Sequence, residues 1–145
     1  MQLKTEIREI SYVKDVVSVG PGTSLREVVR KLHEGQFGSI IITEGKKVKG
    51  IFTERDYLKK IAGREAGLLD QPISEFMTPE PVCVTENELV MKVGMLMRMG
   101  RFRHIVVANE EMELVGIVSI KDVMDFLFDH LTAQGSQTSK AVGWK

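Results

Sequence analysis

The sequence predicts a mixed α/β (α+β) protein built from two β-α-β-β-α repeats that pack around a pseudo-twofold axis. Three observations lead to this fold class: an internal repeat, short apolar strands that alternate with amphipathic helices, and a length of 145 residues. When the second half of the chain is aligned with the first, Val17, Val19, Val28, Gly35, Phe37 and Ile40 fall on Val82, Val84, Val93, Gly100, Phe102 and Ile105. After a single insertion in the next turn, the alignment continues with Gly50, Ile51, Thr53 and Asp56 on Gly116, Ile117, Ser119 and Asp122.

The predicted elements follow the same order in both repeats. A short Val-rich strand leads into an amphipathic helix, two apolar strands then flank a polar turn, and a second helix closes the repeat. In the first repeat these elements are expected at residues 16–19, 25–34, 39–43, 47–52 and 53–61, and in the second at 82–84, 89–99, 104–108, 113–118 and 119–131.

Sequence signals mark both ends of the first helix in each repeat. Ser24 and Thr85 each precede a glutamate by three positions, a spacing that predicts a capping box at the helix start. Gly35 and Gly100 follow the last apolar positions, so we expect them to end these helices as C-cap glycines.

The repeats also set the expected domain boundaries. One repeat of about 55 residues buries too little surface to be comfortably stable alone, so the two should pack face to face and form two equivalent clefts. We expect the first repeat at residues 8–66 and the second at 73–131, with a linker around 63–71. The polar segment 132–145 is expected to be a disordered tail.

Composition argues against several classes of partner. Twenty basic and twenty acidic residues cancel, so no bulk charge attracts nucleic acid or an anionic membrane. The apolar runs are strand-sized, far short of the roughly 20 residues that span a bilayer. Because the single cysteine, Cys83, cannot form an internal disulfide, we expect a cytoplasmic protein.

A hydroxyl, a cation and a carboxylate recur where the last strand of each repeat meets its closing helix, in residues 50–56 and 116–122. The carboxylates of Asp56 and Asp122 can accept hydrogen bonds from both vicinal hydroxyls of a ribose, and a helix N-terminus favours phosphate oxygens. The same spacing from Thr53 and Ser119 also fits a capping box, so both interpretations stay open. Repetition of the whole string favours a ligand-binding role.

Together with residues 74–79 and 102–107, these strings resemble a tandem pair of CBS domains, and the resemblance covers Ser11 to about Leu131. This family, named after cystathionine β-synthase, consists of regulatory modules that bind AMP, ADP, ATP, S-adenosylmethionine or sometimes dinucleotides. The resemblance therefore implies an adenine nucleotide as ligand, no catalytic cofactor, a flat homodimer of pairs, and a regulated protein of unknown identity.

The resemblance also implies that each cleft is shared, with the hydroxyl and Asp of one repeat on the ribose and the other repeat on the base and phosphate. Carried over, the first cleft would consist of Ile51, Thr53, Arg55, Asp56, Thr78, Cys83, Arg103, His104 and Ile105. The second would consist of Val13, Ser18, Gly38, Ser39, Ile40, Ile117, Ser119, Lys121 and Asp122.

The two predicted clefts differ in charge. Gly38 and Ser39 stand in the second cleft where Arg103 and His104 stand in the first, which leaves Lys121 as the nearby cation. Since Arg can bind phosphate oxygens bidentately, the first cleft is expected to prefer the more highly phosphorylated ligand.

Two other functions stay open beside reversible nucleotide binding. Degenerate clefts would leave a structural dimerisation module. A nucleotide-dependent enzyme is disfavoured because no residues have metal-ligand spacing and no nucleophile lies beside a base. The turn at residues 20–25 resembles a dinucleotide-binding fingerprint, but its third glycine is replaced by Leu25, and residues 85–90 of the second repeat contain no glycine.

Overall fold

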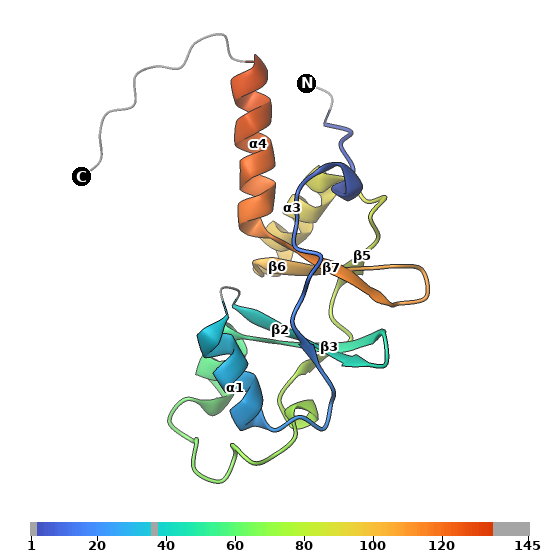
Figure 1. Cartoon of the computed structure of the whole chain (residues 1–145). Coiled ribbons are helices and arrows are strands. Elements are labelled where there is room, and N and C mark those ends of the chain that lie inside the picture. The colour runs from blue at the N-terminus through green and yellow to red at the C-terminus, as the bar shows by residue number, and fades with distance from the viewer. Residues whose placement is uncertain (1–2, 36–37, 135–145) are drawn as a thin grey trace, which may run out of the picture.

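The structure, a computed structural model, describes residues 3–35 and 38–134 and confirms the predicted fold class, with two small sheets lying one above the other (Figure 1). The first repeat contains β1 (Ser18–Val19), α1 (Leu25–Glu34), β2 (Ser39–Glu44), β3 (Lys47–Thr53), α2 (Glu54–Asp56) and the π-helix η2 (Tyr57–Ile61). The second contains β5 (Cys83–Val84), α3 (Val90–Gly100), β6 (His104–Ala108), β7 (Leu114–Ser119) and α4 (Ile120–Gln134). Three further elements are the 3-10 helices η1 (Ile7–Glu9) and η3 (Ile73–Glu75) and the strand β4 (Thr78–Pro79).

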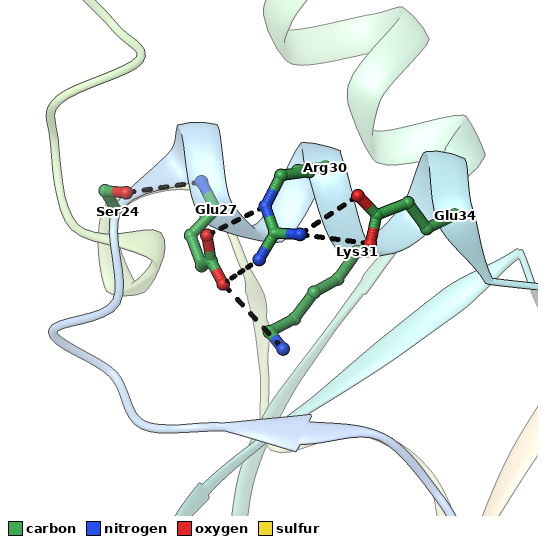
Figure 2. Close-up of polar contacts among 5 residues, drawn as sticks. All are labelled: Ser24, Glu27, Arg30, Lys31 and Glu34. Carbon is green, nitrogen blue, oxygen red and sulfur yellow. Dashed lines mark hydrogen bonds and ion pairs between the residues drawn. The ribbon is translucent and has the colours of Figure 1, made fainter.

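The helix starts agree with the prediction in one repeat only. In α1 the Ser24 hydroxyl accepts a hydrogen bond from the Glu27 amide at 3.2 Å, which is one half of the predicted capping box, whereas the Glu27 carboxylate pairs with Arg30 (Figure 2). The predicted cap at Thr85 is wrong, because α3 begins after Leu89. The Thr85 carbonyl instead accepts from the Glu88 amide at 3.1 Å, which makes a turn ahead of the helix.

The C-terminal ends of these helices also agree with the prediction in the first repeat only. Gly35 is the C-cap of α1, as predicted, but Gly100 is still inside α3. Arg101 takes the left-handed C-cap conformation, with φ of 56°. A Cβ on Gly100 would lie only 2.0 Å from the ring of Phe102, so this position needs glycine for close packing. The expected tail also starts later than predicted, because α4 continues to Gln134; the rest of it lies outside the described residues.

Two short segments, for which no helix or strand was predicted, each place one residue in the core of the other repeat. Ile7 in η1 is fully buried in the core of the second repeat, and Ile73 in η3 is fully buried in the core of the first. The Ile7 amide donates to the Glu88 carbonyl at 2.8 Å, and the Ile73 amide donates to the Thr23 carbonyl at 2.7 Å. These two bonds correspond under the repeat, so the chain exchanges equivalent segments between its halves.

The segment expected as a linker is attached to the first repeat. The Leu25 amide donates to the Gln71 carbonyl at 2.8 Å, and the Ser74 amide donates to the Pro21 carbonyl at 3.1 Å. The backbone of the glycine-rich turn before α1 is therefore hydrogen-bonded to the backbone of η3 and of the segment that precedes η3.

The two β-hairpins meet at the pseudo-twofold axis. The Val48 amide donates to the Met112 carbonyl at 2.9 Å, and the Leu114 amide donates to the Lys46 carbonyl at 3.0 Å. Because the repeat relates Val48 to Leu114 and Lys46 to Met112, the axis exchanges these two bonds. A shared apolar cluster joins the sheets behind them; its buried members are Ile41, Val48, Val106, Ala108 and Ile117. The predicted packing of two repeats around a pseudo-twofold axis is confirmed.

Candidate functional site

The repeated hydroxyl and Asp form capping boxes at both closing helices. Asp56 Oδ2 accepts from the Thr53 amide at 2.9 Å, and Thr53 Oγ1 accepts from the Asp56 amide at 3.2 Å. Ser119 and Asp122 make the same two bonds, at 3.2 Å to the hydroxyl and 2.9 Å to the carboxylate. The capping interpretation is confirmed, and it uses one oxygen of each carboxylate.

In the first cleft, both oxygens of Asp56 have partners. β4 pairs antiparallel with β3, which sets Thr78 opposite Ile51. Thr78 Oγ1 then lies 3.4 Å from Asp56 Oδ1, and Lys60 Nζ lies 3.3 Å from the same oxygen. Lys60 was not predicted as a site residue, although its position four residues after Asp56 on a helix is the usual spacing of an ion pair.

The arginines predicted for the first cleft do not converge on one point. Arg55 Nη1 donates to the backbone carbonyl of Arg101 at 2.7 Å, a contact that reaches across to the second repeat. The side chain of Arg103 is exposed, and its carbonyl accepts from the Ile120 amide at 2.8 Å.

His104 is half-buried and lies opposite Ser119 in the register of β6 and β7. Burial lowers the pKa of His104, the charge of Arg103 acts in the same direction, and the carboxylates of Glu54 and Asp122 oppose both effects. The imidazole is therefore neutral at pH 7. His104 therefore adds no charge to the first cleft, whereas Lys60 adds a cation that was not predicted. The preference of this cleft for a highly phosphorylated ligand stays a prediction.

Two other residues predicted for this cleft, Cys83 and Ile105, lie on β5 and β6. Cys83 pairs with Val106 in the register of β5 and β6, and its thiol donates to the Pro81 carbonyl at 3.3 Å. Burial raises the pKa of the Cys83 thiol, which keeps it protonated. Ile105 is buried, with its side chain in the core of the second repeat.

In the second cleft, a small pocket gathers four of the predicted residues, which are Val13, Ser39, Ile40 and Ile117. Residues 13–17, the crossing segment between η1 and β1, form one wall of the pocket. The Ile117 amide holds this segment by donating to the Val13 carbonyl at 2.9 Å. The pocket also includes four residues that were not predicted, namely Val16, Val17, Lys31 and Gly35. Its walls thus come from the crossing segment, α1, β2 and β7.

Ser39 is the buried polar residue that lines this pocket. It is only 4% exposed, and among the described residues its hydroxyl has no hydrogen-bond partner. A buried hydroxyl without a partner costs about 1–3 kcal/mol, so a ligand or an ordered water that bonds to it is favoured. The carbonyl of the preceding residue, Gly38, accepts from the Glu54 amide at 3.0 Å.

Three of the remaining residues of the second cleft, Ser119, Lys121 and Asp122, lie where β7 meets α4. Lys121 and Asp122 line an open hollow with Ser11 of the N-terminal segment. Lys121 Nζ is 2.6 Å from Asp125 Oδ2, so the predicted cation is already paired. Ser18, on β1, is exposed and is not brought into either hollow.

Two classes of site are absent from the part of the chain that the structure describes. No three or more His, Cys, Asp or Glu side chains within residues 3–35 and 38–134 are grouped so that they could hold a metal ion. The helices of these same residues are all too short or too polar to cross a bilayer.

Known proteins match most of the chain. The CBS domain model matches twice, at residues 7–63 and 73–129. An uncharacterised 17.7 kDa protein of Acidianus ambivalens is 30% identical over 141 residues, which cover 97% of this chain and 84% of that protein. Inosine-5'-monophosphate dehydrogenase of Escherichia coli is 33% identical over 117 residues, but the match covers 79% of this chain and only 23% of the enzyme.

Solved structures show the same architecture. A CBS-domain containing protein from Agrobacterium tumefaciens has a TM-score of 0.69 at 40% identity, over 77% of this chain and 84% of that chain. A CBS domain protein from Pyrobaculum aerophilum, solved in complex with AMP, has a TM-score of 0.74 at 27% identity, over 88% of this chain and 99% of that chain. The chain belongs to the CBS domain family and carries two CBS domains in tandem.

Proposed function

We propose that the chain is a regulatory module that reversibly binds an adenine nucleotide, AMP, ADP or ATP, in the clefts between its two CBS domains. The observation that carries the proposal is a carboxylate oxygen at the start of α4. Asp122 uses Oδ2 for the helix cap, and among the described residues no donor reaches its Oδ1. A carboxylate placed in this way can accept from ribose hydroxyls, and the helix N-terminus beside it favours phosphate. AMP in the related Pyrobaculum aerophilum protein supports the same ligand class.

Binding without turnover fits the side chains at both clefts. Burial raises the pKa of the Cys83 thiol, which makes it a poor nucleophile. Cys83 is the single cysteine of the sequence, which fits a reducing cytoplasm. No catalytic cofactor is part of the proposal. A ligand regulates a partner protein only if it binds two states of the module with different affinity, so the expected output is a change in the angle between the two domains.

Exchange of the two carboxylates for amides tests the ligand site. Asp122→Asn should weaken adenine-nucleotide binding about tenfold or more, because a hydrogen bond to a charged group contributes about 1.5–3 kcal/mol. Asp56→Asn is the matched variant in the first cleft, where Lys60 already pairs with Oδ1, the oxygen that the helix cap does not use. Titration calorimetry against AMP, ADP, ATP, S-adenosylmethionine and NAD measures both effects.

The controls separate the three candidate functions. Both variants should unfold near the wild-type temperature, since an amide oxygen can still accept the capping bond. At a ligand concentration of 100 times Kd, the wild type should gain about 2.7 kcal/mol in unfolding free energy. If no adenosine compound binds at millimolar concentration, the nucleotide proposal fails and the structural module remains. Release of a hydrolysed nucleotide would support the enzyme instead.

The outer face of α4 fits a second copy of this chain. Ile120, Met124, Phe128 and Leu131 recur at helical spacing, and all four are exposed although apolar. Leu58, which corresponds to Met124 under the repeat, is also exposed. A twofold dimer could cover both faces at once, because the halves of each chain are themselves related by a pseudo-twofold axis.

Phe128→Glu should therefore shift the protein from dimer to monomer, because burial of a charge in an apolar interface is costly. Phe128 is 59% exposed in the single chain, so the variant should keep its fold. Sedimentation velocity measures the change. Met112→Glu is the control, since Met112 is an exposed apolar residue on a hairpin tip away from α4, and it should leave the dimer intact. A wild type that sediments as a monomer would contradict the dimer.

A further inference from the structure

We infer that the outer face of α3 is a docking surface for an acidic, amphipathic segment of the protein that this module regulates. This α3 face consists of Lys92, Met95, Arg98 and Met99, and Arg101 extends it past the end of the helix. The inference rests on the proposed function for the existence of a regulated partner. It adds where that partner binds and which side chains recognise it.

The α3 face combines exposed apolar side chains with cations. Met95 is 55% exposed and Met99 is 78% exposed, and the two lie about one helical turn apart. Lys92 and Arg98, on the same side of the helix, are exposed as well. The opposite side, around Val93, is packed in the core of the second repeat. Helix α3 contains no acidic residue, so nothing within the helix offsets these charges.

The corresponding face of α1 neutralises its own charge. Figure 2 shows the Arg30 guanidinium paired with the carboxylates of Glu27 and Glu34, the latter at 2.9 Å. Under the repeat, Glu27, Arg30 and Glu34 correspond to Lys92, Met95 and Met99. Equivalent helices therefore carry a self-neutralised face in the first repeat and uncompensated cations beside methionines in the second.

The cations of the α3 face have no acidic partner in the part of the chain that the structure describes. None of the ion pairs within residues 3–35 and 38–134 includes Lys92, Arg98 or Arg101. The helix dipole favours a cation in the last turn of a helix, which accounts for Arg98. Lys92, by contrast, lies in the first turn of α3, where the dipole disfavours a cation. Helix stability alone therefore does not explain this set of charges.

The end of α3 places one further cation where the two repeats meet. Arg101 is the C-cap residue with φ of 56°, a left-handed conformation that is uncommon for arginine. Arg55 of the first repeat donates from Nη1 to the Arg101 carbonyl at 2.7 Å, and both residues are exposed. A partner that binds Arg101 and Arg55 together contacts both repeats. Its affinity then changes with the angle between them, which is how it would sense a nucleotide in the clefts.

An acidic protein segment with apolar residues at helical spacing fits the α3 face. Its carboxylates would pair with Arg98 and Arg101, since guanidinium groups bind carboxylates bidentately. Its apolar residues would contact Met95 and Met99, because methionine side chains adapt to varied partners. Single-stranded nucleic acid fits less well, since it stacks on exposed aromatic rings and the nearby Phe102 packs against the second core. Another copy of α3 would bring like charges together.

Fluorescence anisotropy on the full chain tests this surface, with a labelled amphipathic helical peptide of glutamate and leucine as the probe. The double variant Arg98→Gln, Arg101→Gln should weaken peptide binding about tenfold or more, because it removes two charge-assisted contacts. Met99→Ser should weaken it about fivefold, which a purely electrostatic contact would not show. Arg26→Gln is the matched control: Arg26 is an exposed arginine of α1 that pairs with Asp70, and its loss should leave peptide binding unchanged.

Calorimetry with AMP on the same variants separates this inference from the nucleotide proposal. The double arginine variant should bind AMP as the wild type does, because neither residue belongs to a predicted cleft. If the wild type binds AMP but not the peptide, the docking surface is overturned and nucleotide binding stands. If the peptide binds and no adenosine compound does, the nucleotide proposal fails and the docking surface stands.

Three further results would overturn the docking surface. The first is unchanged peptide affinity in a folded double arginine variant. The second is tighter binding of single-stranded oligothymidylate than of the peptide, which would assign the face to nucleic acid. The third is a shift of the double variant from dimer to monomer in sedimentation velocity, which would mean that a second copy of the chain covers the face.

Discussion

Ile7→Ala is expected to lower the free energy of unfolding by about 2–5 kcal/mol, although it changes a residue in a short N-terminal turn. Ile7 is fully buried in the core of the second repeat, beside Val84 and Val90, which lie far from it in the sequence. Truncation leaves a cavity there that the surrounding strands and helix cannot close. Urea denaturation followed by circular dichroism measures the loss.

The equivalent variant and an exposed control sharpen this test. Ile73→Ala should cost a similar amount, because Ile73 fills the corresponding place in the core of the first repeat. Val82→Ala should change stability by less than about 0.5 kcal/mol, since Val82 is 50% exposed. A cost below about 1 kcal/mol for Ile7→Ala would mean that the N-terminal turn does not belong to the second core.

Gly116→Ala has the second large expected effect. A Cβ at this position would lie 2.5 Å from the carbonyl oxygen of Val13 and 2.6 Å from the ring of Tyr12. The backbone of the crossing segment must then move away and lengthen its bond from the Ile117 amide, now 2.9 Å. We expect a loss of about 1–3 kcal/mol in unfolding free energy, together with weaker AMP binding, since Val13 and Ile117 line the pocket of the second cleft.

Gly50→Ala, at the matching position of the first repeat, should cost less. Its nearest neighbour would be the Met77 sulfur, at 2.4 Å, and a methionine side chain can rotate out of the way. Gly22→Ala is the neutral control, because no atom lies within 4 Å of its would-be Cβ. Thermal unfolding ranks the three variants. Equal costs at the two repeated glycines would show that the clash with Val13 is relieved without strain.

The periodic parts of the fold were accessible from the sequence. The order of strands and helices, the bounds of α1 and the pseudo-twofold packing follow from apolar spacing and from the repeat, both of which are local or self-similar signals. The exchanged turns around Ile7 and Ile73 were missed because such short segments carry no period. The weak signal for them is the pattern Ile-x-Glu, which occurs at 7–9 and again at the equivalent positions 73–75.

The residues of the two clefts were harder to interpret than their backbone positions. Counting charges along the chain indicates a cationic first cleft, but that count includes His104, which burial keeps neutral, and misses Lys60, which pairs with Asp56. Lys31 was missed because its partner in the repeat is Leu96, so no duplicated pattern points to it. The repeat identifies what the two halves share, whereas we expect the ligand preference to depend on the residues at which they differ.

The exchange of η1 and η3 between the halves has a consequence for synthesis of the chain. The first repeat receives Ile73 soon after its own helices and can complete its core early. The second must wait for its last strands before Ile7, which is synthesised ahead of both repeats, finds its place. Such contacts between distant residues slow folding and couple the halves into one cooperative unit. A growing chain therefore holds Ile7 unburied until the strands and helices of the second repeat have been synthesised.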